Sequence, residues 1–316
     1  MSVPPDVAMV SLLGAQDQWL RQLEGSLDAD LMARGNEVTA RGSTTAVAGA
    51  IRVIEELAAL VSRGHVLDQH TVAQTVRIVR GGTDEAASDV LGEPLLAHRG
   101  RTIRPKTLNQ KRYLDAIRSN TVTFGIGPAG TGKTYLAMAM AVQALRAKQV
   151  NRLILARPAV EAGERLGYLP GTLSEKIDPY LRPLWDALRD MMEVEELVRH
   201  MDQGTIEVAP LAYMRGRTLN DAFIVLDEAQ NTTPEQMKMF LTRIGFGSLA
   251  VVTGDVSQVD LPRGAHSGLR VVRGILDGIE GVAFMTLDSE DVIRHHIVQR
   301  IVEAYSRHDE RADAEA

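Results

Sequence analysis

Hydrophobic and polar positions follow one pattern up to about residue 80 and a different pattern after residue 120. In the first part, apolar residues recur every three or four positions, which predicts amphipathic helices, and two short alternating runs meet at a glycine, which predicts a hairpin. The predicted elements are a short strand or arm at 1–10, a helix at 14–27, a hairpin at 31–40, a helix that follows Ser43 and ends before Gly64, and a helix at 68–79. Their order predicts a small α+β unit.

From residue 121 onward, short continuous apolar runs alternate with helical stretches. Such runs indicate strands that are buried on both faces, and their alternation with helices is typical of a parallel sheet covered by helices on both faces. The predicted strands are 121–126, 152–156, 205–208, 222–226, 249–253 and 282–287. The pattern predicts an α/β fold for this part of the chain.

These patterns divide the chain into four regions. Residues 1–80 form the small α+β domain, and residues 81–106 form a linker with a basic hairpin. Residues 107–306 form the α/β domain, and residues 307–316 form a polar, disordered tail. A chain of 316 residues suits one large domain together with a smaller one.

Composition excludes several classes of protein. The chain contains no cysteine, which excludes disulfides, thiolate zinc sites and a cysteine nucleophile. Its net charge of −6 excludes binding to nucleic acid through overall basicity, but not through a local basic strip. No apolar run approaches the ~20 residues that span a bilayer, and the first ten residues lack the basic start of a secretory signal. We therefore expect a cytoplasmic protein that makes no membrane contact.

A glycine-rich segment follows the first predicted strand of the α/β domain and matches the phosphate-binding pattern G-x-x-x-x-G-K-[ST]. Its glycines allow successive backbone N–H groups to face phosphate oxygens at the positive end of the following helix. Lys133 can reach the β- and γ-phosphates of a nucleotide, and the Thr134 hydroxyl can bind Mg²⁺. The expected nucleotide-binding residues of this loop are Gly127, Pro128, Ala129, Gly130, Thr131, Gly132, Lys133 and Thr134.

Two adjacent carboxylates end the predicted strand 222–226. Asp227 suits the role of holding Mg²⁺ together with Thr134, partly through water. Glu228 would then face the γ-phosphate, where a carboxylate can orient and deprotonate the attacking water. Because a kinase would direct its base at a substrate hydroxyl, this pair favours hydrolysis, with Lys133 and Glu228 as catalytic residues.

Three further residues are candidates for nucleotide contacts. Asp255 and Gln258 follow the predicted strand 249–253, where polar side chains can sense the γ-phosphate and couple its presence to movement of the next loop. The amide of Gln110 can both donate to and accept from adenine, which would favour adenine over guanine. On this feature alone, a solvated surface glutamine is the better interpretation of Gln110.

A basic strip precedes the α/β domain. Arg99, Arg101, Arg104 and Lys106 form the most basic segment of an otherwise acidic chain, and Arg99-Gly100-Arg101 can form the turn of a second hairpin. The strip is a candidate contact for RNA phosphates. A solvated hairpin is the alternative.

Several segments together resemble the PhoH family over about residues 100–305. They are Pro105–Thr107 with Gln110, the loop 127–134, residues 156–164, 166–171 and 178–183, Asp227–Asn231, Gly254-Asp255 with Gln258, and Asp291–His295. The resemblance implies a cytoplasmic ATPase with a RecA-like P-loop NTPase domain related to the first domain of superfamily 1 helicases. It also implies ATP and Mg²⁺ as ligands, a role in RNA processing or ribosome maturation, an endoribonuclease partner and, in some members, a link to phosphate starvation.

The N-terminal unit is similar to the KH-like region of this family, but it lacks the G-x-x-G segment that grips RNA backbone in KH modules. This absence weakens the case for nucleic-acid binding by residues 1–80, and a protein contact is nearly as good an interpretation. Nothing in this region resembles the clustered carboxylates of a fused nuclease.

Helicases of the related class close ATP between two RecA-like domains. Too few residues follow Gly254 for a second domain of about 150 residues, so we expect another subunit to complete the site. This predicts a homo-oligomer with head-to-tail contacts, most simply a ring, with a hexamer as the first guess. The candidate arginine fingers are Arg294 first, then Arg263, with Arg300 as a third position.

The sequence thus predicts a Mg²⁺-dependent ATPase coupled to RNA binding, remodelling or unwinding. The alternative is a nucleotide-gated adaptor that binds RNA or protein, hydrolyses ATP little and recruits an endoribonuclease. A small-molecule kinase has less support, because the Asp227-Glu228 pair is of the hydrolase type and no arginine-rich lid follows it.

Overall fold

A computed structural model describes residues 1–83, 85–158, 173–262, 264–293, 297–298, 300–301 and 304–305, and for 173–179 it describes the backbone alone. The chain divides into two compact units, Met1–Asp115 and Ala116–Ala316. The division falls inside helix α6, Leu108–Ser119. The sequence places the start of the α/β domain slightly earlier, at residue 107.

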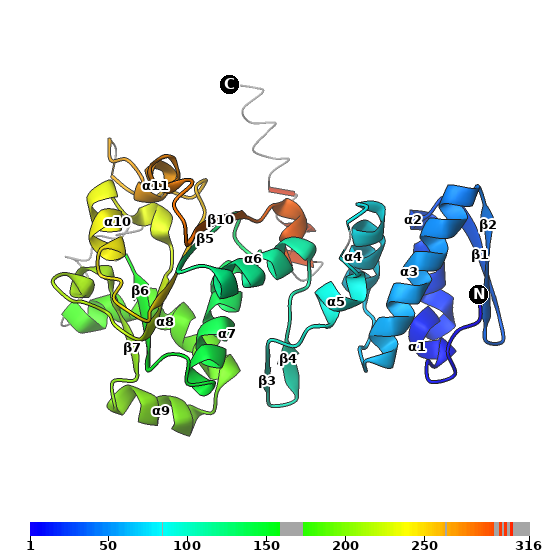
Figure 1. Cartoon of the computed structure of the whole chain (residues 1–316), viewed down its shortest axis with the longest axis horizontal. Coiled ribbons are helices and arrows are strands. Elements are labelled where there is room, and N and C mark those ends of the chain that lie inside the picture. The colour runs from blue at the N-terminus through cyan, green and yellow to red at the C-terminus, as the bar shows by residue number, and fades with distance from the viewer. Residues whose placement is uncertain are drawn as a thin grey trace. The chain divides into compact units, whose positions relative to one another are not determined.

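The N-terminal unit combines helices with two short antiparallel hairpins (Figure 1). Its elements are α1 Met9–Leu13, α2 Gln18–Ser26, β1 Ala29–Arg34, β2 Glu37–Gly42, α3 Thr44–Ser62, α4 Gln69–Arg80, α5 Ala87–Gly92, β3 Leu96–His98 and β4 Arg101–Ile103. The predicted hairpin at 31–40 is confirmed as β1–β2, in which Arg34 faces Glu37. The predicted turn at Arg99-Gly100 is confirmed between β3 and β4.

Local capping and apolar spacing explain the two long helices of this unit. The backbone N–H of Ala46 donates to the Ser43 hydroxyl at the start of α3, and the N–H of Thr71 donates to Asp68 at the start of α4. One face of α3 is buried, with Val53, Ile54, Leu57 and Leu60 at most 1% exposed. Burial of this face against α4 and α5 drives the packing of the unit.

The segment between the two predicted domains is more structured than its composition indicates. Residues 81–95 are acidic and rich in small residues, yet α5 forms within them. Val90 and Leu91 are buried, and Ala87 and Ser88 lie with them. Small residues can form a buried helix face without a strongly hydrophobic pattern, so the sequence pattern gives little sign that a helix forms here.

The C-terminal unit contains a six-stranded parallel sheet in the order β10-β5-β9-β8-β6-β7. Its strands are β5 Val122–Ile126, β6 Arg152–Arg157, β7 Ile206–Pro210, β8 Ala222–Leu226, β9 Leu249–Gly254 and β10 Val282–Thr286. Its helices are α7 Lys133–Arg146, α8 Leu173–Met191, α9 Val194–Asp202, α10 Pro234–Leu241 and α11 Gly268–Leu276. All six predicted strands are present, and the predicted α/β fold with a parallel sheet is confirmed.

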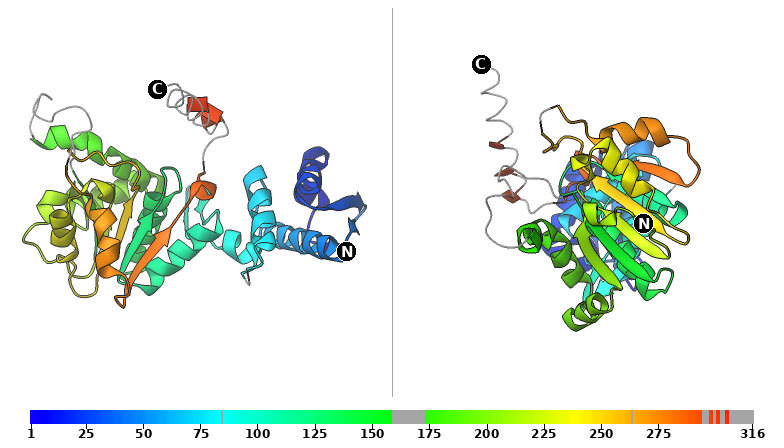
Figure 2. Two further views of the ribbon diagram at one scale, coloured as in Figure 1. Left: turned by 90° about the horizontal axis from the view of Figure 1, so that it is seen from above. Right: turned by 90° about the vertical axis from the view of Figure 1, so that its left-hand side faces the viewer.

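Helices cover both faces of this sheet (Figure 2). On one face, alternate strand residues such as Phe124, Ile224 and Val252 pack with Phe240 of α10 and Leu269 of α11. On the other face, α7 packs on β6, β8 and β9, and α8 packs on β6 and β7. Successive side chains of a strand point to opposite faces, so burial on both faces accounts for the continuous apolar runs.

The strand order determines where polar side chains gather. β5, β9 and β8 are consecutive neighbours, and all run in the same direction. The residues that follow these three strands therefore meet at one edge of the sheet, where ligands bind in open α/β sheets.

The longest helices of the described ranges are α3 and α8, each of 19 residues. Arg52, Glu55 and Glu56 interrupt the apolar residues of α3. Within the part of the chain that the structure describes, no helix is long and apolar enough to cross a bilayer.

Candidate nucleotide-binding site

The glycine-rich segment forms a tight loop between β5 and α7. Gly132 caps α7 in the left-handed region at φ 78°, where a side chain would be strained. At Gly127 the loop passes so close to the end of β10 that an added Cβ would lie 2.2 Å from the carbonyl oxygen of Leu287. The Ile293 N–H also donates to the Gly130 carbonyl at 3.0 Å. The residues after β10 therefore pack directly on the loop.

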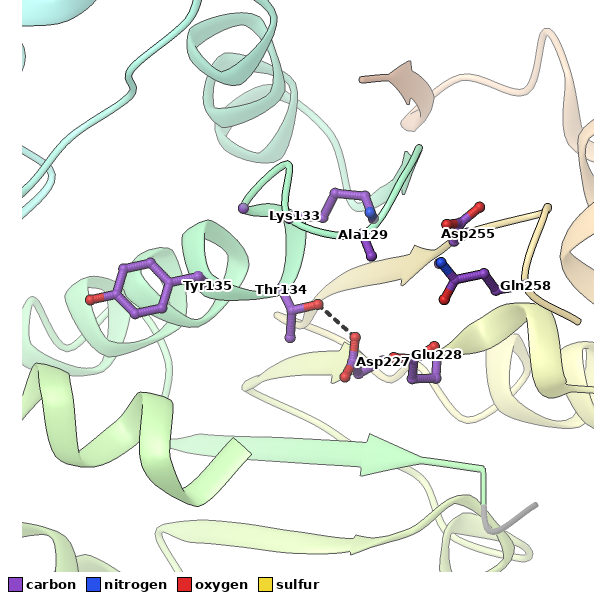
Figure 3. A pocket seen from close by; sticks show the side chains of 11 residues that line it. Ala129, Lys133, Thr134, Tyr135, Asp227, Glu228, Asp255 and Gln258 are labelled. Carbon is purple, nitrogen blue, oxygen red and sulfur yellow. Dashed lines mark hydrogen bonds between the residues drawn. The ribbon is translucent and has the colours of Figure 1, made fainter. Parts of the chain in front are cut away.

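A cavity of about 270 Å³ opens beside this loop, close to the lower limit of ligand pockets. Its walls come from the loop, the start of α7 and the segments after β8 and β9. The residues that line it include Ala129, Gly130, Gly132, Lys133, Thr134, Tyr135, Asp227, Glu228, Gly254, Asp255 and Gln258. The structure thus brings together the three sequence motifs that were expected to contact one nucleotide (Figure 3).

Lys133 is folded back onto its own loop. Its ammonium group donates to the carbonyl oxygens of Gly127 and Pro128, at 2.7 Å each, and to the Thr131 hydroxyl at 3.2 Å. Burial lowers the pKa of Lys133, and nearby carboxylates, Asp255 foremost, oppose this shift. A nucleotide phosphate would offer this buried cation stronger acceptors than neutral carbonyls.

The Thr134 hydroxyl donates to Oδ1 of Asp227 at 2.6 Å, which joins the loop to the end of β8 (Figure 3). The Thr253 hydroxyl donates to the same oxygen at 2.8 Å. Asp227 is only 6% exposed, so these hydrogen bonds fix its carboxylate within the cavity wall.

The donor atoms fit Mg²⁺. A hydroxyl and a carboxylate lie together, and Mg²⁺ usually takes one or two such protein ligands while substrate phosphates and water complete its octahedron. Oδ2 of Asp255 is buried at the same cavity and has no hydrogen-bond partner within the described residues, which leaves it available to metal-bound water. The described residues contain no cluster of three His, Cys, Asp or Glu side chains that could hold a metal by themselves.

Both carboxylate oxygens of Glu228 are engaged. Oε1 accepts from Nη2 of Arg157 at 3.1 Å, and Oε2 accepts from Nε2 of Gln230 at 2.5 Å. Nη1 of Arg157 also lies 3.9 Å from Oδ2 of Asp227. The backbone of Glu228 is left-handed, at φ 53°, which is unusual for a residue with a side chain and typical of strain at a functional site.

Gln230 connects the second motif to the third. Its amide NH₂ donates to Glu228, and its amide oxygen accepts from the backbone N–H of Asp255 at 3.0 Å. The side chain is 1% exposed. A displacement of the segment after β9 would therefore be transmitted to Glu228 through one buried amide.

Other predicted site residues lie elsewhere or outside the described residues. Gln110 is buried in the N-terminal unit, where its Oε1 accepts from the backbone N–H of Lys106 at 2.7 Å. Its adenine contact stays a prediction. Arg263 and Arg294 lie outside the described residues, as do residues 159–172, and Arg300 is exposed.

The basic strip divides into two pairs. Arg99 and Arg101 are exposed at the turn and first residue of the β3–β4 hairpin. Arg104, which is partly exposed, and Lys106, which is exposed, line a second cavity whose described lining residues all belong to the N-terminal unit.

Two residues of the site, Arg157 and Gln230, received no role in the sequence analysis. Arg157 is the last residue of β6, and β6 is the neighbour of β8. A basic residue at the carboxyl end of a predicted parallel strand is the feature that could have drawn attention to it. Gln230 follows the carboxylate pair by two positions, within reach of Glu228.

Comparisons with known proteins agree on one family. A family model described as PhoH-like protein matches residues 102–306. A PhoH-like protein of Mycobacterium tuberculosis is 63% identical over 310 residues, which cover 98% of this chain and 88% of the relative. A PhoH-like protein of Bacillus subtilis is 48% identical over 304 residues, covering 96% and 95%. Protein PhoH of Escherichia coli is 44% identical over 199 residues, covering 62% of this chain and 56% of that protein.

Proposed function

The chain belongs to the PhoH family, and we propose that it binds ATP with Mg²⁺ at the cavity beside residues 127–134 and hydrolyses it. One observation carries the proposal: the Thr134 hydroxyl and the Asp227 carboxylate meet at 2.6 Å. These residues are distant in sequence, and each comes from a motif that suits one end of a Mg²⁺–phosphate complex.

Each side chain has a defined part in this proposal. The loop N–H groups and Lys133 bind the β- and γ-phosphates, and Thr134 and Asp227 hold the metal. Bound Mg²⁺ would neutralise negative charge on the phosphate oxygens. Glu228 orients the attacking water and accepts its proton. Arg157 and Gln230 are positioning residues, since each holds one oxygen of the Glu228 carboxylate.

The same contacts favour a second candidate, a nucleotide-gated adaptor with slow hydrolysis. Each carboxylate oxygen of Glu228 already accepts one hydrogen bond, so the attacking water competes with Arg157 and Gln230 for the negative charge of this carboxylate. Binding of RNA or a protein partner that displaced the segment after β9 could loosen the Gln230 contact and raise the rate of hydrolysis. The two candidates differ in the basal rate of ATP turnover.

Coupling to RNA and assembly into a ring are further parts of the proposal. RNA remodelling or unwinding, a role in ribosome maturation, recruitment of an endoribonuclease and a cytoplasmic location rest on the family resemblance. A basic hairpin in an acidic chain supports an RNA contact. An arginine from a second subunit, with Arg294 the first candidate, would stabilise charge in the transition state.

Nucleotide binding and turnover by the purified protein test the proposal. We expect Mg²⁺-dependent release of phosphate from ATP, and loss of that release when the metal is chelated. Lys133→Ala should weaken ATP binding by about 10–100-fold, the scale of losing hydrogen bonds from a charged donor. Lys238→Ala, an exposed lysine of α10 outside the cavity, is the matched control and should bind as wild type. Equal ATP affinity of the two variants would contradict the assignment of the phosphate site.

A further inference from the structure

A second cavity, of about 320 Å³, lies within the N-terminal unit. It is bounded by the loop between α3 and α4, the first turn of α4, the end of α5, the β3–β4 hairpin at Gly100 and Thr102, and the residues after β4. Four basic side chains from these segments line it: His65, His70, Arg104 and Lys106. They are distant in sequence, so the fold itself brings them together.

Arg104 is the central basic group of this cavity. Its guanidinium contacts the ring of His65, and no carboxylate lies within ion-pairing distance of it in the described part of the chain. Burial lowers the pKa of Arg104, and no neighbouring acid opposes that shift. A bound anion would supply the counter-ion that this guanidinium lacks within the described residues.

The pKa values of the two histidines of the cavity are lowered, mainly by burial. Burial and the charge of Arg104 lower the pKa of His65, with Arg63 acting in the same direction and the carbonyl of Gly92 opposing. Burial also lowers the pKa of His70, which Asp68 raises and Lys106 lowers. Both imidazoles therefore carry less positive charge than exposed histidines near neutral pH, although they can become charged donors.

One acid, Asp68, also lines the cavity, and its first carboxylate oxygen is already engaged. Oδ1 of Asp68 accepts from the backbone N–H and the hydroxyl of Thr71, at 2.7 and 2.8 Å, where it caps α4. Burial by itself would raise the pKa of Asp68, but these hydrogen bonds lower it overall. The Asp68 carboxylate stabilises the start of α4. Four basic side chains line the cavity together with this one acid.

We propose that this cavity binds a phosphate group through Arg104, Lys106, His65 and His70. A guanidinium donates to two oxygens of a phosphate at once, and the ammonium and imidazole groups approach from other segments. The volume exceeds that of one phosphate, so the sugar or base attached to it can also enter.

This phosphate site is separate from ATP hydrolysis. It rests on the proposed RNA contact only in one respect, because an RNA phosphodiester is one possible source of the phosphate. It assigns recognition to Arg104 and Lys106 with two histidines, rather than to a uniform strip that includes Arg99 and Arg101. A failure at this cavity would leave ATP turnover untouched, so the two proposals can be tested separately.

Binding of two probes to the full chain tests the proposal. The probes are a fluorescein-labelled single-stranded oligouridylate, followed by anisotropy, and inorganic phosphate, followed by calorimetry, both in the absence of nucleotide. Arg104→Gln should weaken binding by about tenfold or more. Arg41→Gln has the same change of charge at an exposed position of β2 outside the cavity and should bind as wild type. His65→Gln provides a second variant in case Arg104→Gln fails to fold, which circular dichroism would reveal.

The outcomes separate the sources of phosphate. Weaker binding of oligouridylate by Arg104→Gln, but not by Arg41→Gln, supports the site and identifies a phosphodiester ligand. Loss of inorganic phosphate binding alone supports the site for a free phosphate. Wild-type affinity of Arg104→Gln and His65→Gln for both probes, or loss in Arg99→Gln and Arg101→Gln instead, would overturn the proposal, as would failure of the wild type to bind either probe.

The pH dependence gives an independent measurement. A bound phosphodiester stays ionised and adds negative charge beside His65 and His70, so it raises the pKa of each imidazole and binding takes up protons. Affinity for oligouridylate should therefore increase as the pH falls from about 8 to about 6. This increase should be lost in the double variant His65→Gln, His70→Gln, and an unchanged pH profile would contradict the assignment of the histidines.

Discussion

Glu228 combines a left-handed backbone with a carboxylate that is held on both sides. Strain at a residue of this kind persists only where surrounding contacts determine the conformation. Here Arg157 and Gln230 supply those contacts from neighbouring segments, and both residues also touch a second part of the site, Asp227 and Asp255 respectively. The position of the proposed base is therefore coupled to the metal ligand and to the segment after β9.

A substitution at Arg157 tests this coupling at the scale of one residue. Arg157→Ala frees one oxygen of Glu228, and a misplaced base should lower kcat by about 10–100-fold with little change in the KM for ATP. Arg157→Lys should restore part of the rate, because an ammonium keeps one hydrogen bond. Arg152→Ala, at the opposite end of β6, serves as the control in steady-state kinetics. If Arg157→Ala turns over ATP at the wild-type kcat, Arg157 has no role in positioning the base.

The sequence predicts some contacts of this site and misses others for a physical reason. The fixed spacing of the glycine loop and the adjacent Asp227-Glu228 pair specify their own local geometry, so their chemistry can be predicted without the fold. The contact between Arg157 and Glu228 depends on β6 lying next to β8, which is a property of strand order. The pattern of apolar and polar residues along the chain does not determine strand order, so it could not predict this contact.

At the scale of elements, continuous apolar runs predict all six strands of the sheet. The same reasoning misses α5, because its buried face is made partly of alanine and serine. The sequence likewise treats Arg99, Arg101, Arg104 and Lys106 as one strip. Pairing of β3 with β4 instead leaves the first two at the hairpin and places the last two beside His65 and His70.

The contact between the phosphate loop and the end of β10 gives a prediction about elements. An alanine Cβ at Gly127 would meet the backbone of Leu287, so Gly127→Ala should lower the free energy of unfolding by about 1–3 kcal/mol and weaken ATP binding. Gly274→Ala is the matched control, because it lies in α11 with open space around it and should stabilise the protein by about 0.5–1 kcal/mol. Urea denaturation measures both. Equal stability of Gly127→Ala and wild type would mean that the loop and β10 separate freely.

At the scale of the whole molecule, the chain consists of two units, each with its own cavity. One cavity combines a phosphate loop with carboxylates, and the other has an excess of basic side chains. The difference suits a molecule that uses a nucleotide in one unit and binds a separate phosphate-bearing ligand in the other.

Mixed oligomers test whether a neighbouring subunit completes the ATP site. Lys133→Ala protein should bind ATP only weakly but can still donate Arg294, whereas Arg294→Ala protein can bind ATP but cannot donate. If the arginine acts across the interface, mixing the two should recover part of the ATPase activity that each lacks, since such an arginine contributes about 10³–10⁵ in rate. An absence of rescue would place Arg294 outside the catalytic site or within its own chain's site. Full activity of a protein that stays monomeric would contradict completion by a neighbour.

The most direct test of the central claim is ATP turnover by Glu228→Gln, measured beside its ATP affinity and with and without single-stranded RNA. Glutamine keeps the shape of the side chain but cannot accept a proton from water. We expect ATP affinity close to wild type and a turnover slower by about 100-fold or more, the usual scale for loss of a general base. Wild-type turnover by Glu228→Gln, or a wild-type protein that hydrolyses no ATP in either condition, would contradict the account of this protein as an ATPase that uses Glu228 as its base.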